Sequence, residues 1–187
     1  MSGAFYLAAL AVVLAGYGAK DELTLRALRD HDDRTRGLMG IALFTSTISA
    51  AVMAWAGLTL GASLSASARM MLIAFVLLLA GIEILRPVRK PDMHEPTRSF
   101  GAIALVLLAR QIPDGPRLLV FAVAAFTQAG WLAAIGGALG GAATALRALI
   151  GPSGGHSIRT ERRPRIALGL AVILLGVVLG LRARGIV

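Results

Sequence analysis

The sequence predicts an all-α integral membrane protein in which six transmembrane helices form two inverted three-helix repeats. Apolar residues make up 57% of the 187 residues, and the mean hydropathy is +0.76. That share exceeds the roughly 45–50% of ordinary globular domains. Six apolar stretches approach or exceed the roughly 18–20 residues that cross a hydrocarbon core. The two halves of the chain can also be laid over each other, which favours a repeat.

The apolar stretches define the predicted spans and leave only short connections between them. We expect one membrane domain over residues 1–187, with repeat one at 1–86, a cytoplasmic linker at 87–98 and repeat two at 99–187. Residues 1–3 contain no Lys or Arg, so we expect the first span to be retained rather than cleaved as a signal peptide. The predicted spans are residues 4–27, 37–60, 68–86, 99–124, 131–150 and 166–183.

The repeat is visible as a gap-free superposition of residues 5–28 on residues 100–123. Phe5 then falls on Phe100, and Leu10 falls on Leu105. The match continues through two further apolar segments in each half. Because each unit has three spans, the second unit enters the membrane from the opposite side, as in transporters with a substrate site at the midplane between the repeats.

The basic residues predict the orientation of the chain. The connections at 29–36, 86–98 and 147–165 hold twelve Lys and Arg residues, against three on the opposite side. By the positive-inside rule, we expect a multi-pass protein of a bacterial-type inner (plasma) membrane with both termini outside. The loops 29–36, 87–98 and 151–165 would then be cytoplasmic. This topology accounts for the net charge of +9, so we expect the lipid bilayer, and no nucleic acid, as a partner.

Two polar stretches interrupt the spans at equivalent positions of the repeats. The first contains Lys20, Asp21 and Glu22. The second runs from Arg110 to Arg117. Charged groups at membrane depth are costly and usually face a cavity or a partner. Both stretches are therefore candidates for substrate or ion binding, although Lys20 could instead snorkel to the inner interface.

The second stretch is the sharper signal for an ion site. Pro113 and Pro116 each remove a backbone donor, and Gly115 adds flexibility, so we expect a helix break. Freed carbonyls, Gln111 and the charge of Asp114 would then bind a cation or proton, and Asp114 is the one candidate metal ligand. Arg110 and Arg117 lie within ion-pair reach of Asp114 if the segment is helical. The alternative is that these arginines simply neutralise Asp114.

Small residues recur every four positions in the second and fifth spans. Such spacing lets helices approach closely, which matters in lipid because apolar bulk alone gives no net association. Packing within the chain is the simpler interpretation, and a homodimer face is the alternative for Gly136, Gly137, Gly140 and Gly141.

Six short spans with a polar break in the first span of each triplet resemble the transmembrane protein 165/Gdt family of cation/proton exchangers, in the lysine-exporter-like superfamily. The family signature, Glu-x-Gly-Asp-Lys-Thr, falls on residues 16–21 and 111–116. This chain retains its Gly and Lys as Gly18 and Lys20 and one Asp as Asp114, while Gln111 stands for a Glu. The resemblance implies exchange of manganese or calcium for protons. Because one carboxylate remains of four, it implies a weakened site.

We therefore expect a small transporter of the cation/proton exchange type with a degenerate ion site. The alternatives are a non-transporting membrane scaffold derived from a transporter, and an exporter of a small organic solute. The sequence has no cysteine and no nucleophile–base arrangement, phosphate loop or metalloprotease motif in a plausible setting. We thus expect no enzyme activity and no cofactor, apart from the transported cation itself.

Overall fold

The protein is described by a computed structural model that covers residues 3–31, 35–87, 100–151 and 158–186. These residues form helices without any strand, which confirms the all-α class over this part of the chain. Most of the predicted linker, and parts of the other two basic loops, lie outside the described residues. The helices are α1 (Gly3–Gly16), α2 (Lys20–His31), α3 (Thr35–Ser63), α4 (Ala66–Leu85), α5 (Phe100–Gln111), α6 (Gly115–Thr127), α7 (Gly130–Ile150) and α8 (Ile158–Ala183).

Four helices, α3, α4, α7 and α8, are long and apolar enough to cross a membrane. Helices α1 and α2 together make a fifth candidate span, bent by 62° at the break between them. Helices α5 and α6 are apolar but individually short, with 12 and 13 residues. The described helices thus have the length and composition of a multi-pass membrane protein with four or five candidate spans, where the sequence predicted six.

The break between α1 and α2 lies at residues 17–19. Gly18 adopts a φ of 63°, a left-handed conformation that costs other L-residues about 1–2 kcal/mol. Its backbone N–H donates to Glu22 Oε2 at 2.8 Å, so the side chain of the new helix satisfies a donor at the break. The chain therefore ends one helix and begins another instead of continuing the span that the apolar run predicted.

The break between α5 and α6 lies at residues 112–114. Asp114 is the N-cap of α6, and its Oδ1 accepts from the backbone N–H of Gly115 at 3.0 Å. Pro116 stands in the first turn, where the missing N–H of proline leaves no hydrogen bond unmade. Gly115 is required by space as well, because a Cβ there would lie 2.7 Å from Ile84 Cγ1. Gly115 thus allows a close approach of α6 to α4, whereas the sequence analysis expected it to add flexibility.

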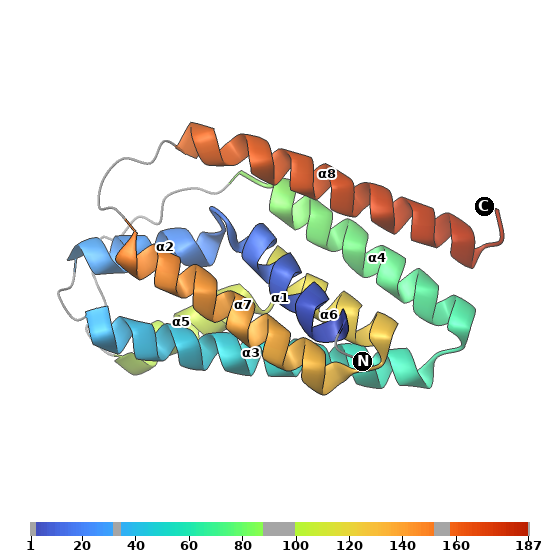
Figure 1. Cartoon of the computed structure of the whole chain (residues 1–187), viewed down its shortest axis with the longest axis horizontal. Coiled ribbons are helices and arrows are strands. Elements are labelled where there is room, and N and C mark those ends of the chain that lie inside the picture. Colours follow the sequence, from blue (N-terminus) through green and yellow to red (C-terminus); the bar gives the residue numbers. More distant parts are fainter. Residues whose placement is uncertain (1–2, 32–34, 88–99, 152–157, 187) are drawn as a thin grey trace.

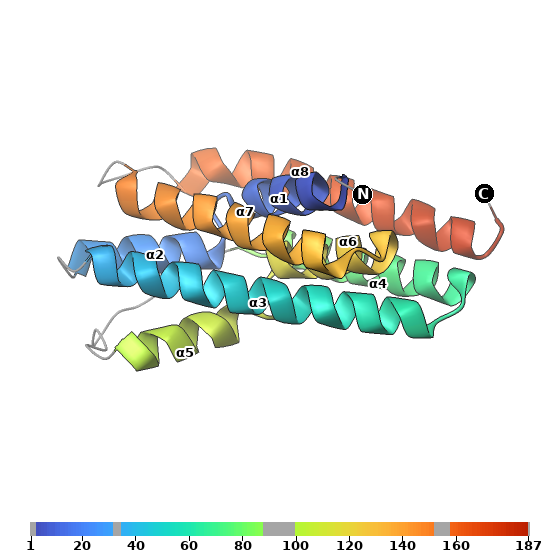
Figure 2. The same cartoon turned by 60° about the horizontal axis from the view of Figure 1, so that its bottom comes forward.

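The helices pack as two long pairs around a central helix. Helix α3 runs along α7, and α4 runs along α8, as Figure 1 and the turned view in Figure 2 show. Helix α6 lies between them and contacts α3, α4, α1 and α7. Helix α1 packs mainly on α7 and α6 and barely touches α8. Among the described helices, α8 consequently has one substantial neighbour, which is α4.

The ends of the helices gather at two opposite ends of the bundle. Helices α2 and α7 end, and α3, α5 and α8 begin, at the left of Figure 1. We call this the basic end, since the arginine-rich connections join these helices. The termini and the α3–α4 and α6–α7 connections lie toward the other end. Trp55 and Trp131 belong to the halves of α3 and α7 nearer that end and are exposed, as side chains facing a membrane interface would be.

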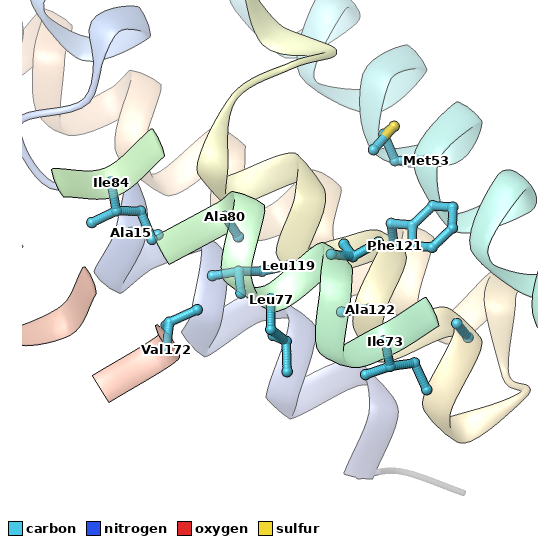
Figure 3. Packing of buried hydrophobic residues seen from close by; sticks show 12 residues of the cluster. Ala15, Met53, Ile73, Leu77, Ala80, Ile84, Leu119, Phe121, Ala122 and Val172 are labelled. Carbon is cyan, nitrogen blue, oxygen red and sulfur yellow. The ribbon is translucent and has the colours of Figure 1, made fainter. Parts of the chain in front are cut away.

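The largest apolar cluster lies between α4 and α6. Figure 3 shows Leu77 and Ala80 from α4 together with Leu119 and Ala122 from α6, and Val172 reaches the cluster from α8. Nine residues of α6 are buried, which makes it the core of the bundle. The cluster therefore fixes the position of α6, and with it the position of Asp114 at its first turn.

Glycines let the helices approach each other at backbone distance. A Cβ at Gly57 would lie 2.3 Å from the carbonyl oxygen of Phe121, and one at Gly81 would lie 2.9 Å from that of Gly169. Van der Waals packing of this kind is what holds helices together in lipid.

The four glycines of α7 are buried inside the chain, as packing within the chain, the simpler interpretation of the pattern, predicts. A Cβ at Gly136 would meet the Phe5 carbonyl at 2.3 Å, and one at Gly140 would meet the Ala9 carbonyl at 2.8 Å. Gly137 and Gly141 face α3 and α6 in the same way. The close-packing surface of α7 is therefore filled by α1, α3 and α6.

Candidate functional site

The two helix breaks meet at one small cavity in the middle of the bundle. The cavity has a volume of about 20 Å³, which is room for about one water molecule or a small ion. Residues of both halves of the chain line it: Val12, Gly16, Ala19, Asp21, Glu22, Asp114, Pro116, Arg117, Gly141 and Thr144. Side chains 93 positions apart in sequence, Asp21 and Asp114, thus share one enclosed space.

Asp114 is positioned by its role as the N-cap of α6. One of its oxygens accepts the Gly115 N–H, as described above, and the residue is only 5% exposed. The positive end of the helix dipole favours a carboxylate at this position. No ion pair within 4 Å joins Asp114 to a cation of the described residues, so the helix end and the cavity are its main surroundings.

Asp21 stands in the first turn of α2, as the second residue after the break between α1 and α2. Its Oδ1 is buried and has no hydrogen-bond partner among the described residues. The charges of Asp114 and Arg117 act on it directly. A buried oxygen without a partner is costly. Asp21 is therefore the group in this cavity that most needs a ligand, a proton or a water molecule.

Arg117 supplies a positive charge beside both carboxylates. Its guanidinium is buried and donates to the Gly137 carbonyl at 3.1 Å and to Ser46 Oγ at 2.9 Å. Gly141 leaves room for it, since a Cβ there would lie 2.7 Å from Arg117 Nη2. Its hydrogen-bond partners are neutral, while Asp21 and Asp114 provide the compensating field.

Gln111 lies at the end of α5 and is held by hydroxyl groups of α3. Its Oε1 accepts from Ser49 Oγ at 2.9 Å, and its Nε2 donates to Thr45 Oγ1 at 3.4 Å. Gln111 is thus engaged with α3, and it does not line the cavity with Asp114.

Glu22 forms a separate ionic cluster between α2 and α7. Its carboxylate accepts from Arg147 Nε at 3.1 Å and also pairs with Arg26. The guanidinium of Arg147 lies over the ring of Tyr17, 4.4 Å from the centroid. Although Glu22 touches the cavity wall, its oxygens are already saturated by arginines and by the N–H of Gly18.

Lys20 pairs with Glu83 of α4, which also accepts from Arg86 at 3.0 Å. Lys20 is therefore drawn toward α4, and Glu83 connects the start of α2 to the last turn of α4. The Lys20 charge still acts on Asp114.

Arg110 lies outside the cavity. It is exposed, and its Nη1 donates to Thr24 Oγ1 at 3.1 Å. The two arginines that flank Asp114 in sequence thus point to different places, and only Arg117 lines the cavity. Pro113 is exposed on the outer side of the break.

The cavity offers two carboxylates and one guanidinium to a ligand of about the size of one water molecule. Among the described residues, no group of three or more His, Cys, Asp or Glu side chains is placed so that it could hold a metal ion. Divalent cations in protein sites usually have more oxygen ligands than two carboxylates supply. The cavity therefore suits a proton or a single small cation. Such a cation would replace Arg117 as the charge that balances the two carboxylates.

The sequence reasoning missed the hydroxyl groups of α3 and the role of Arg147. Thr45 and Ser46 precede Ser49 by four and three positions in α3. That spacing places them on one face of a helix, and this was an available signal. The pairing of Arg147 with Glu22 joins residues far apart in sequence and had no local signal.

No protein-family model, curated protein or solved structure matches this chain. The resemblance to the transmembrane protein 165/Gdt family accordingly stays a prediction from the motif residues.

Proposed function

We propose that the protein is a small membrane transporter of the cation/proton exchange type, in which Asp21 and Asp114 bind the transported ion or proton. One observation carries this proposal. Carboxylates from the two helix breaks line the same ion-sized cavity, and an oxygen of Asp21 in it lacks a hydrogen-bond partner. A structural pair would be expected to have its oxygens satisfied.

The arrangement of the helices supports an inverted repeat of six spans. On the repeat alignment, α3 corresponds to α7 and α4 to α8, and these corresponding helices are the ones that pack along each other. Two helices that are related by a nearby pseudo-two-fold axis are expected to lie next to each other in this way. Each repeat begins with a broken span, α1 with α2 and α5 with α6. Ion sites of inverted-repeat transporters are built from such discontinuous helices.

In the proposed mechanism, the ion replaces Arg117 as the partner of the two carboxylates. Arg117 already has neutral partners in Ser46 and the Gly137 carbonyl, so it stays hydrogen-bonded when the ion arrives. Rocking of one repeat against the other would open the cavity to each side in turn. The basic end would face the cytoplasm of a bacterial-type cell.

Flux of Mn²⁺ and Ca²⁺ into everted vesicles, with and without a proton gradient, tests the proposal. Asp114→Asn is the informative variant, because Asn is as good an N-cap as Asp and the start of α6 is preserved. Asp21→Asn removes the other charge. Thr47→Ala is the control, since Thr47 is an exposed residue of α3 that does not line the cavity. We expect both Asp variants to lose proton-coupled flux and the control to keep it.

Full flux in Asp114→Asn and Asp21→Asn would overturn this mechanism. Absence of flux in the folded wild type would instead favour a scaffold derived from a transporter. In such a scaffold, Arg117 would permanently balance the charge of the two carboxylates. An organic-solute exporter would require the cavity to enlarge greatly from about 20 Å³. Stabilisation of the purified protein by amino acids or organic anions would support that function.

A further inference from the structure

A second and much larger hollow lies between α1 and α8, near the basic end of the bundle. It has a volume of about 610 Å³, within the range of about 300–1,000 Å³ that is usual for ligand pockets. It exists because α1 packs on α7 while α8 packs on α4, so the two helices barely touch. We call it the α1/α8 groove, and its walls are Val13, Leu14, Tyr17, Arg147, Pro164, Arg165, Ala167 and Leu168.

The groove is polar at one end and apolar along the rest. Arg147 stands in the last turn of α7 and Arg165 in the first third of α8, both toward the basic end. Val13 and Leu14 lie about one turn before the end of α1, and Leu168 lies one turn further along α8 than Arg165. The apolar part is thus deeper in the membrane than the two arginines.

Tyr17 brings the two guanidinium groups together. Arg147 lies over its ring, and Arg165 Nη1 donates to its carbonyl oxygen at 3.3 Å. Arg165 Nη2 also donates to the Ile84 carbonyl at 3.1 Å, which holds the side chain across the groove. Two cations anchored on one residue create a positive site, and none of the described residues that line the groove is acidic.

The carboxylate that pairs with Arg147 does not cancel this charge. Glu22 pairs with both Arg147 and Arg26, so that cluster keeps a net positive charge before Arg165 is counted. Arg162 and Arg163 add exposed charges at the start of α8. The region therefore complements an anion at the depth of the lipid headgroups.

The apolar part continues onto a surface that faces lipid. Leu7, Leu10 and Leu14 form an exposed stripe along α1, since they are spaced three and four residues apart. An acyl chain that follows this stripe toward the basic end enters the groove beneath Arg147 and Arg165.

We propose that the α1/α8 groove is a binding site for one anionic phospholipid, with the phosphate at Arg147 and Arg165 and an acyl chain against Val13, Leu14 and Leu168. Basic pockets between transmembrane helices bind anionic headgroups in this way. The bound lipid fills the space between α1 and α8 and so becomes the second neighbour of α8.

Binding of phosphatidylglycerol to the purified, detergent-solubilised protein tests the site, with phosphatidylcholine as the neutral comparison and native mass spectrometry as the readout. Wild type is expected to retain one phosphatidylglycerol molecule and to be stabilised thermally by it. Arg165→Gln should lower the preference for phosphatidylglycerol by about fivefold, as expected for one lost cationic contact.

Ala167→Trp provides a test that leaves both arginines in place, because the indole fills the groove. Ile166→Trp is its control, since Ile166 is an exposed neighbour that does not line the groove. We expect Ala167→Trp to abolish phosphatidylglycerol binding and Ile166→Trp to retain it, with both variants monodisperse and helical.

Three results would overturn the proposal. These are equal retention of phosphatidylglycerol and phosphatidylcholine by the wild type, unchanged binding in Ala167→Trp, and a dimer that Ala167→Trp dissociates. Inorganic phosphate that protects the protein as well as phosphatidylglycerol does would show an anion site without the lipid chain, and would equally contradict it.

Discussion

Arg117 Nη2 donates to Ser46 Oγ at 2.9 Å and thereby connects the first turns of α6 to the middle of α3. Both residues are at most 3% exposed. The bond keeps the guanidinium beside the cavity while its other nitrogen holds the Gly137 carbonyl. The position of the internal cation thus depends on one hydroxyl group and one backbone carbonyl.

Ser46→Ala is expected to destabilise the protein by about 1–3 kcal/mol, because a buried charged donor loses its acceptor. The free energy of unfolding in mixed bicelles and dodecyl sulfate measures this effect. Thr47→Ala is the control, since Thr47 is the next residue along the helix and its exposed hydroxyl bonds only to the Leu43 carbonyl. Equal effects of the two substitutions would mean that the Arg117 bond adds nothing.

Gly57→Ala is expected to destabilise the packing of α3 on α6 by about 1–3 kcal/mol, through overpacking. The new methyl group would lie 2.3 Å from the Phe121 carbonyl oxygen, so the helices must separate. Gly40→Ala, on the same helix, has no atom within 4 Å of its Cβ. Thermal unfolding in detergent should show a lower Tm for the first variant and an unchanged or higher Tm for the second.

Gly18→Ala is expected to cost about 1–2 kcal/mol, because Gly18 has a φ of 63° that alanine adopts only with strain. Gly18→Asn should cost less, since asparagine tolerates this conformation. The two variants retain the N–H that Glu22 accepts, so their difference in Tm reports the backbone alone. A Gly18→Ala protein as stable as wild type would show that the break has a different conformation.

Glu22→Gln is expected to destabilise the protein by on the order of 2 kcal/mol, since it leaves two arginines without their shared carboxylate. The value is set below that of a fully buried pair because the Arg147 side chain is 33% exposed. A double-mutant cycle with Arg147→Gln isolates the pair, and we expect a coupling energy of about 0.5–3 kcal/mol. A coupling energy of zero would mean that the ion pair contributes nothing to the packing of α2 on α7.

The apolar runs predicted where most helices lie, because a helix that crosses the membrane needs an apolar run as long as the hydrocarbon core is thick. The run 131–150 corresponds to α7, and the run 68–86 corresponds to α4. The run 4–27 was misleading at its centre, where two helices meet at 62°. Apolar content does not encode the direction of a helix, and Gly18 together with the polar residues that follow it marked the position of the bend. Helix α8 begins earlier than the predicted span, at Ile158, because arginine-rich sequence is also compatible with a helix.

For the candidate site, the sequence pointed to Asp114 because two prolines and a glycine surround it. It also named Asp21 as a candidate ion-binding residue, together with Lys20 and Glu22 of the same polar stretch. That the two carboxylates line one cavity follows from the way α6 is buried among four helices, which no local pattern describes. Arg110 and Arg117 have the same charge and similar spacing from Asp114, yet only packing decides which of them turns inward.

The pairing of α4 with α8 has a consequence for how the protein is made. Translation reaches Ile158 about seventy residues after it has completed Leu85, which takes about 4–14 seconds at the usual speed of synthesis. During that interval α4 is already in the membrane without the helix that Gly81 is shaped to receive. Helix α8 therefore completes the packing of α4 late in synthesis, and a chain interrupted after α7 would present an unfinished surface to the quality-control proteases of the cell.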